Sequence, residues 1–109
     1  MKNALRCARD VIVRTAAFDA AVDFYGRMLG VSPARHGDAL VAFETGAFCL
    51  YVEKGPSHGP VFEFLVDDVQ AEKRRLLDDG CSLVEEDASV PRCYLRDPYG
   101  LVFNLGRAR

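Results

Sequence analysis

The chain has 109 residues, of which 50% are apolar and 28% charged, which is enough for one modest globular core. Fourteen Lys and Arg residues stand against 16 Asp and Glu residues, and a formal net charge of −2 argues against nucleic acid or an anionic membrane as partner. No apolar run approaches the roughly 18 residues of a membrane span, and Met1–Arg6 lacks the apolar region of a signal peptide, so a cytoplasmic protein is expected.

The first half of the chain predicts a strand, a helix and a hairpin, which cover Asp10–Arg14, Phe18–Leu29, Leu40–Glu44 and Ala47–Val52. Apolar residues recur in the helix at three- and four-residue spacing, so its buried stripe is expected to include Tyr25 and Met28, with Phe24 at its edge. Gly30 can end this helix in the left-handed conformation. Thr45-Gly46 supplies the hairpin turn.

The second half repeats this order of elements after a segment typical of a connector, Lys54–Pro60, which holds two glycines and two prolines. It predicts a strand, a helix, a further strand and a closing hairpin, which cover Val61–Val66, Val69 to Gly80, Cys81–Glu85, Cys93–Arg96 and Leu101–Leu105. Asp67 or Asp68 is expected to cap the helix. The chain therefore contains an internal duplication that is visible in element order.

The closing hairpin turns at Asp97-Pro98-Tyr99-Gly100, where each residue type suits its place in a turn. Beyond the turn, Leu101, Phe103 and Leu105 alternate with Val102 and Asn104. This period of two predicts a strand with one face on a core, and the face that carries Asn104 is where function is sought.

Each half thus predicts a βαβββ module, the first over about residues 9–53 and the second over about 61–106, within a single domain of residues 1–109. One helix covers only one face of four strands, so the expected fold is α+β: a curved, mostly antiparallel, eight-stranded open-barrel sheet with helices outside and a concave pocket inside. A half of about 50 residues buries too little surface to stand alone, so the halves must associate, within one chain or by exchange between chains. A homodimer is expected.

The four cysteines are widely spaced and form no C-x-x-C pair. In a reducing compartment they are expected to be ordinary core or surface thiols, namely Cys7, Cys49, Cys81 and Cys93. A catalytic thiol stays open as an alternative, because one sequence cannot show which His lies near it in space.

Three segments carry a family resemblance, namely Asp19–Tyr25 with Leu29-Gly30, Val66-Asp67-Asp68-Val69, and Asp97–Gly100. In this order and spacing the sequence resembles the vicinal oxygen chelate superfamily, also called the glyoxalase/bleomycin resistance protein/dioxygenase family, over nearly the whole chain. The resemblance implies the glyoxalase/bleomycin resistance fold. It also implies that the enzymes of the family hold a divalent metal at the base of the cup through His, Glu or Gln side chains.

By similarity, the metal positions of the family fall on Asp10, Tyr51, Val61 and Asn104. Val61 has no donor atom, and Asn104 stands where metal-binding members carry Glu. Asp10 and an amide oxygen would hold a hard cation only weakly, so no metal and no other cofactor is expected. A register slip that brings His58 or Glu63 into range stays open as the route to a divalent metal.

Alternation places a mostly apolar set of side chains on the inner face, namely Asp10, Ile12, Arg14, Cys49, Tyr51, Val61, Glu63, Leu65, Cys93, Leu95, Val102 and Asn104. The functional interpretation makes six of them ligand-binding: Asp10, Arg14, Tyr51, Glu63, Val102 and Asn104. The structural interpretation instead pairs Arg14 with Glu63 and lets Asn104 satisfy a backbone group.

The expected function is therefore metal-free binding or sequestration of a small organic compound in the cup, most similar to the bleomycin-resistance type. The carboxylates of Asp10 and Glu63 would suit a cationic compound, although Arg14 weakens that inference. The alternative is a lyase, isomerase or dioxygenase of the same superfamily, which uses a divalent metal or acid–base catalysis by Glu63 or Asp10. A third alternative is a non-catalytic dimeric regulatory module.

Overall fold

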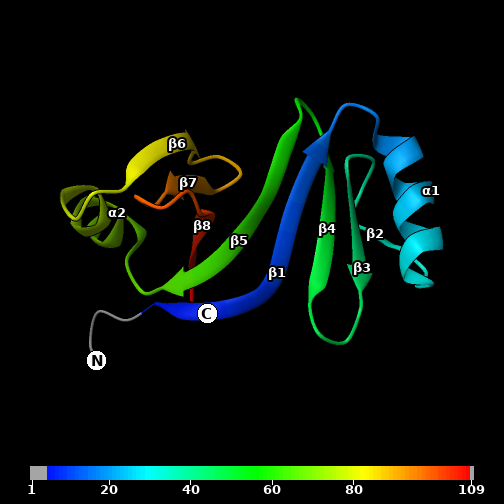
Figure 1. The fold of residues 1–109 in the computed structure, drawn as a ribbon, viewed down its shortest axis with the longest axis horizontal. Coiled ribbons are helices and arrows are strands. Elements are labelled where there is room, and N and C mark those ends of the chain that lie inside the picture. Colours follow the sequence, from blue (N-terminus) through cyan, green and yellow to red (C-terminus); the bar gives the residue numbers. More distant parts are fainter. Residues whose placement is uncertain (1–4, 109) are drawn as a thin grey trace. The chain divides into compact units, whose positions relative to one another are not determined.

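The computed structural model describes residues 5–108, and its elements follow the predicted order (Figure 1). Eight strands and two helices cover these residues, with the bounds β1 Arg6–Thr15, α1 Phe18–Leu29, β2 Ala34–Arg35, β3 Leu40–Glu44, β4 Cys49–Lys54, β5 His58–Val66, α2 Val69–Asp78, β6 Ser82–Asp87, β7 Arg92–Arg96 and β8 Val102–Arg107. The chain divides into two compact units. Unit 2 is Arg9–Pro60, and unit 1 consists of the described residues on either side of it.

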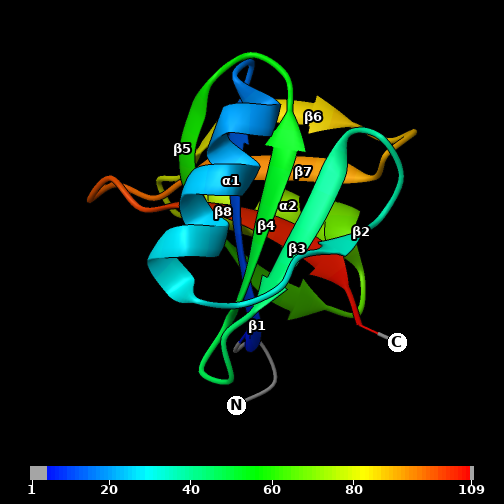
Figure 2. The ribbon, with the colours of Figure 1, turned by 90° about the vertical axis from the view of Figure 1, so that its right-hand side faces the viewer.

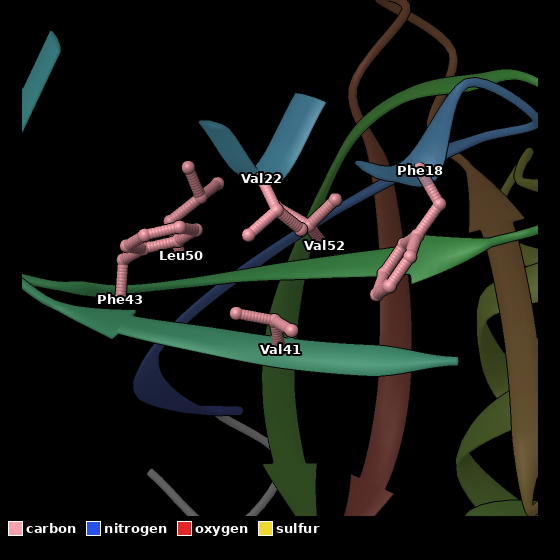
Figure 3. Close-up of a cluster of buried hydrophobic side chains, with 6 residues drawn as sticks. All are labelled: Phe18, Val22, Val41, Phe43, Leu50 and Val52. Carbon is pink, nitrogen blue, oxygen red and sulfur yellow. The ribbon is translucent and has the colours of Figure 1, made fainter. Parts of the chain in front are cut away.

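Unit 2 has the strand order β2-β3-β4-β1, in which β1 runs parallel to β4 and the other pairs are antiparallel. Helix α1 covers one face of these strands (Figure 2). Its Phe18 and Val22 meet side chains of β3 and β4, and the cluster also holds Val41, Phe43, Leu50 and Val52 (Figure 3). Burial of this apolar cluster is the main source of stability for the unit.

The helix α1 ends as predicted, but its stripe is narrower than predicted. Gly30 takes a φ of 65°, and its backbone N–H donates to the carbonyl oxygen of Gly26. Phe24 and Met28, however, are 51% and 58% exposed. At 100° per residue, Phe24 lies about 200° around the helix from the buried Val22, so it cannot share the face that packs on the sheet.

Unit 1 has the same topology as unit 2. Its strand order is β5-β8-β7-β6, with β5 parallel to β8 and the other pairs antiparallel. Helix α2 begins after Asp68, whose side chain accepts a hydrogen bond from the backbone N–H of Ala71. The buried cluster of this unit holds Val66, Cys93, Leu95, Phe103 and Leu105. The predicted fold class is therefore confirmed: two βαβββ modules supply eight strands in mixed pairing and two helices.

Two strands differ from the prediction. Strand β5 already begins at His58, inside the segment predicted as a connector, because Gly and Pro are tolerated at the first residues of a strand. The two-residue strand Ala34–Arg35 was not predicted, since two residues cannot show an alternation. Neither helix within residues 5–108 is long and apolar enough to cross a membrane.

The first prediction concerns the core of unit 1. Leu95 is fully buried, so Leu95→Ala should lower the free energy of unfolding by about 2–5 kcal/mol, through lost burial and the cavity left behind. Leu83 is 45% exposed and provides the matched control, because Leu83→Ala should cost about 1 kcal/mol or less. Urea denaturation followed by circular dichroism measures both, and equal losses would contradict the assigned core.

A second prediction concerns the link between α2 and β6. Lys73 Nζ lies 3.0 and 2.9 Å from the two carboxylate oxygens of Glu86, and this contact holds the pKa of Glu86 below its ordinary value. A carboxylate whose pKa is lower in the folded protein stabilises the fold above its unfolded pKa of about 4.3, and this stabilisation is lost as pH falls through the folded pKa. Glu86→Gln should therefore show a smaller loss of stability between pH 7 and pH 3 than the wild type, measured by urea denaturation. An unchanged pH dependence would count against the link.

Candidate functional site

Asn104 lies in the middle of β8 and is only 6% exposed. Its Oδ1 accepts a hydrogen bond from the backbone N–H of Cys93 at 2.9 Å, and its Nδ2 donates to Oε2 of Glu63 at 3.0 Å. A backbone N–H can only donate, so it must face the carbonyl oxygen of the amide. The NH₂ group is therefore directed at Glu63, and the orientation of the amide is fixed by its partners.

Glu63 comes to this place through the pairing of β5 with β8. The two strands are parallel, and their register sets Glu63 beside Asn104 and Leu65 beside Gly106. Since Phe103 and Leu105 pack in the core cluster of unit 1, their neighbours Asn104 and Gly106 lie on the other side of the strand, here called the face opposite α2. Glu63 is half-buried there, and by the same alternation the face carries the apolar Val61, Leu65 and Val102.

The structure corrects the predicted face of β7. The turn between Arg96 and Val102 holds five residues, so β7 and β8 pair as Arg96 with Val102, Leu95 with Phe103 and Tyr94 with Asn104. Cys93 and Leu95 were predicted beside Asn104, but both belong to the core cluster. Tyr94 takes the predicted place. When the turn of a hairpin holds an odd number of residues, two paired residues are both even-numbered or both odd-numbered. The five turn residues therefore indicate that Tyr94, and not Cys93 or Leu95, shares the face of Asn104, and the prediction missed this signal.

Tyr94 brings further groups to the face opposite α2. It is 3% exposed, and the guanidinium carbon of Arg92 lies 5.4 Å from the centroid of its ring, within the range of a cation–π contact. Arg92 Nη1 also donates to Oε2 of Glu85 at 2.7 Å. Unit 1 therefore places an ion pair and a buried phenol in strands next to the Glu63–Asn104 pair.

Three predicted site residues belong to unit 2. Asp10 pairs in register with Cys49, and Tyr51 pairs with Ile12, on the side of β1 and β4 away from the core cluster. The ring of Tyr51 lies 6.1 Å from that of His36. Arg14 Nε donates to the carbonyl oxygen of Pro56 at 2.8 Å. Of the six predicted ligand-binding residues, the structure thus joins Glu63 with Asn104 by a hydrogen bond.

Unit 2 also contains a groove of about 400 Å³ that was not predicted. It lies beside the C-terminal end of α1, and its lining includes apolar Val22, Val31 and Pro33 with charged Asp23, Arg27 and Arg35. The residues come from a helix, a loop and the short strand β2, a combination that no contiguous motif could indicate.

The donor set at the family's metal positions does not fit a divalent cation. The side chain of Val61 is hydrocarbon and 1% exposed. Asn104 can offer a metal only its amide oxygen, a neutral donor that also accepts the backbone N–H of Cys93. His58 lies in β5, and its Nδ1 is 2.9 Å from the carbonyl oxygen of Gly59. Within residues 5–108, no three His, Cys, Asp or Glu side chains gather in a way that could hold a metal.

The environments of three cysteines disfavour a nucleophilic thiol at these positions. Burial raises the pKa of the Cys49, Cys81 and Cys93 thiols above their ordinary value. A raised pKa lowers the fraction of thiolate, which is the nucleophilic form. All four cysteines are free thiols.

The Glu63–Asn104 contact gives a third prediction. Asn104→Asp replaces a donor by a carboxylate directed at another carboxylate, and one of the two must be protonated to relieve the repulsion. The variant should therefore lose more stability at pH 7 than at pH 5. Asn104→Ala is the control, with a loss of about 1–3 kcal/mol at both pH values, since it leaves the Cys93 N–H without its partner. Urea denaturation at the two pH values measures this, and a pH-independent loss in both variants would contradict the contact.

Comparison with known proteins places this geometry in a family. A family model described as a glyoxalase-like domain matches residues 10–106. A search among curated proteins gave no significant match. Among solved structures, a glyoxalase/bleomycin resistance protein/dioxygenase superfamily member from Vibrio splendidus 12B01 is similar with a TM-score of 0.63 and 16% identity, over 96% of this chain and 100% of that chain.

Two further structures share the fold. The Mn(II)-bound glyoxalase from Novosphingobium aromaticivorans has a TM-score of 0.59 and 19% identity, over 95% of this chain and 40% of that chain. Methylmalonyl-CoA epimerase from Mycobacterium tuberculosis has a TM-score of 0.56 and 18% identity, over 96% of this chain and 87% of that chain. Since the family model covers nearly all of the sequence, the chain belongs to the glyoxalase-like domain family of the vicinal oxygen chelate superfamily.

Proposed function

We propose that this protein binds a small organic molecule against the face opposite α2, without a metal, and that Glu63 and Asn104 are the polar anchor of the site. One observation carries the proposal: the carboxylate of Glu63 is held 3.0 Å from a buried amide of fixed orientation. A few fixed polar groups among apolar side chains are the usual composition of a small-molecule site.

The structural role of Asn104 does not account for Glu63. The carbonyl oxygen of Asn104 satisfies the N–H of Cys93, and this alone would explain a buried Asn on β8. Glu63 is half-buried on a strand that also presents Val61 and Leu65, so a charged group stands among apolar side chains. This combination supports a role in recognition beside the structural contacts of Glu63.

The chemistry of the anchor indicates what the ligand carries. An ionised carboxylate only accepts hydrogen bonds, so the matching ligand group is a donor, and a protonated amine or an amidine is the strongest choice. Val102, on the same face of unit 1, stays in the proposal as a further apolar contact. Asp10, Arg14 and Tyr51 belong to unit 2 and stay predictions from the sequence.

A second candidate is an enzyme of the superfamily, such as an isomerase or lyase. The observation in its favour is the same positioned carboxylate, since Glu63 could take a proton from an acidic C–H of a substrate. Structures named as a glyoxalase and an epimerase share the fold, which is a likeness of fold alone. No step through a metal is included, because the donor set does not fit one.

A third candidate is a dimeric regulatory module, in which association of two chains is the function. A homodimer also belongs to the main proposal, and light scattering of the purified protein tests it. Different measurements distinguish the three candidates: binding of a compound, turnover of a substrate, and association with a partner chain.

The test of binding is a thermal-shift screen of the full chain against a panel of small organic amines, amidines and cationic drugs, with neutral and anionic compounds beside them. A compound well above its Kd should raise Tm by more than about 2 °C, because it binds only the folded state. Glu63→Gln should remove most of the shift by the best hit, because it replaces the charge with a neutral amide of nearly the same shape.

Arg35→Ala is the control for this screen, because Arg35 lines the groove of unit 2 and not the face opposite α2. A shift that survives Arg35→Ala and disappears in Glu63→Gln supports the proposed site. A shift that disappears only in Arg35→Ala would assign the compound to the groove and overturn the proposal. A panel without any hit would favour the regulatory candidate.

A further inference from the structure

We infer that Gly106 and Asn104 are positioning residues for Glu63: Gly106 leaves free the space that the carboxylate occupies, and the Asn104 amide holds it there. The consequence for ligand recognition rests on the function proposed above. The part that these two residues play in placing the side chain is tested without a ligand.

The space at Gly106 is filled by Glu63. A Cβ atom on Gly106 would lie 2.8 Å from Oε2 of Glu63 and 3.3 Å from Cδ2 of Leu65. Gly106 does not have a positive φ, so its backbone conformation is one that other residues also adopt. The glycine is therefore not required by the backbone, and a glycine within a strand is otherwise unfavourable.

The same oxygen, Oε2, receives the amide of Asn104. That amide is fixed on its other side by the backbone of Cys93. Two residues of β8 thus place the carboxylate: Asn104 donates a hydrogen bond to it, and Gly106 has no side chain that would occupy its space. Asn104 and Gly106 are two apart on the strand and so lie on the same face.

The internal duplication provides a comparison within the same chain. Glu63 and Ile12 are each three residues before the end of the first strand of their module, while Asn104 and Tyr51 are each three before the end of the last strand. Both pairs are in register across parallel strands.

Gly106 has its counterpart in Glu53, one residue before the end of β4. In unit 2, β1 carries the aliphatic Ile12, and the position that matches Gly106 holds the side chain of Glu53. In unit 1, β5 carries Glu63, and this position is a glycine. Glu63 and the two residues that place its carboxylate thus occur together in one module, and none of the three occurs at the matching positions of the other.

This arrangement matters for binding because a free glutamate side chain samples many rotamers, and fixing it costs entropy when a ligand arrives. In this protein the hydrogen bond and the shape of the strand fix it before binding. Glu63 is then a preorganised acceptor for the donor group of the ligand.

The test uses the side-chain amide signals of Asn104 in nitrogen-labelled full-length protein. The sequence contains two Asn and one Gln, so only three side-chain amides have to be assigned. In the wild type the Asn104 NH₂ should exchange slowly with solvent, because it is bonded and buried. Gly106→Ala should displace the flexible end of Glu63 and so remove the acceptor of the Asn104 NH₂. The Asn104 signal should then move to the position that it has in Glu63→Ala, and its exchange with solvent should become about tenfold faster or more. The Tm of Gly106→Ala should change little.

Gly59→Ala is the matched control, since Gly59 also lies in a strand without positive φ and a Cβ there would meet nothing within 4 Å. It should leave the Asn104 signal unchanged. Glu63→Leu provides the reference without an acceptor if Glu63→Ala does not fold. An Asn104 signal that is the same in Gly106→Ala as in the wild type would overturn the inference. A positioned Glu63 in a protein that binds no compound would overturn the proposed function and leave the inference intact.

Discussion

The arrangement of unit 1 depends on the two-residue alternation of strand β8. This strand lies between β5 and β7, so its side chains define both faces of the unit. Phe103 and Leu105 enter the core cluster, and Asn104 and Gly106 are thereby directed to the face opposite α2. A slip of one residue would bury the amide in the core and expose both apolar side chains. The register that stabilises the core is therefore the same one that assembles the candidate site.

The chemistry of this face follows from the complementarity of its hydrogen bonds. A backbone N–H orients the amide of Asn104, and the amide then meets a carboxylate. Val61, two residues before Glu63 on β5, adds only hydrocarbon to this face. The fold is shared with proteins named as a glyoxalase and an epimerase, while the groups on this face are those of this chain. Fold and chemistry vary independently in this way in many superfamilies.

Local signals in the sequence were sufficient for most of the fold and for the face of the site, but not for its contacts. The helix and its end at Gly30 were predicted, because its apolar spacing and its C-terminal glycine are both local features. Alternation also placed Glu63 and Asn104 on the expected face. Their hydrogen bond depends on the register of two parallel strands 41 residues apart, for which no short segment carries a signal. Tyr94 was missed because the number of residues in the turn was not used to assign the faces of β7. The start of β5 at His58 was missed because glycine and proline suggested a loop.

The glycine in β8 has a consequence for comparing relatives. In a relative with a larger residue at the position of Gly106, a glutamate at the position of Glu63 would have to leave the place that its carboxylate takes here. Substitutions at these positions should then occur as linked changes, and a relative that keeps only one of the three residues has lost the arrangement. The identity of one small residue thus becomes a marker by which members with and without this carboxylate can be sorted from sequence alone.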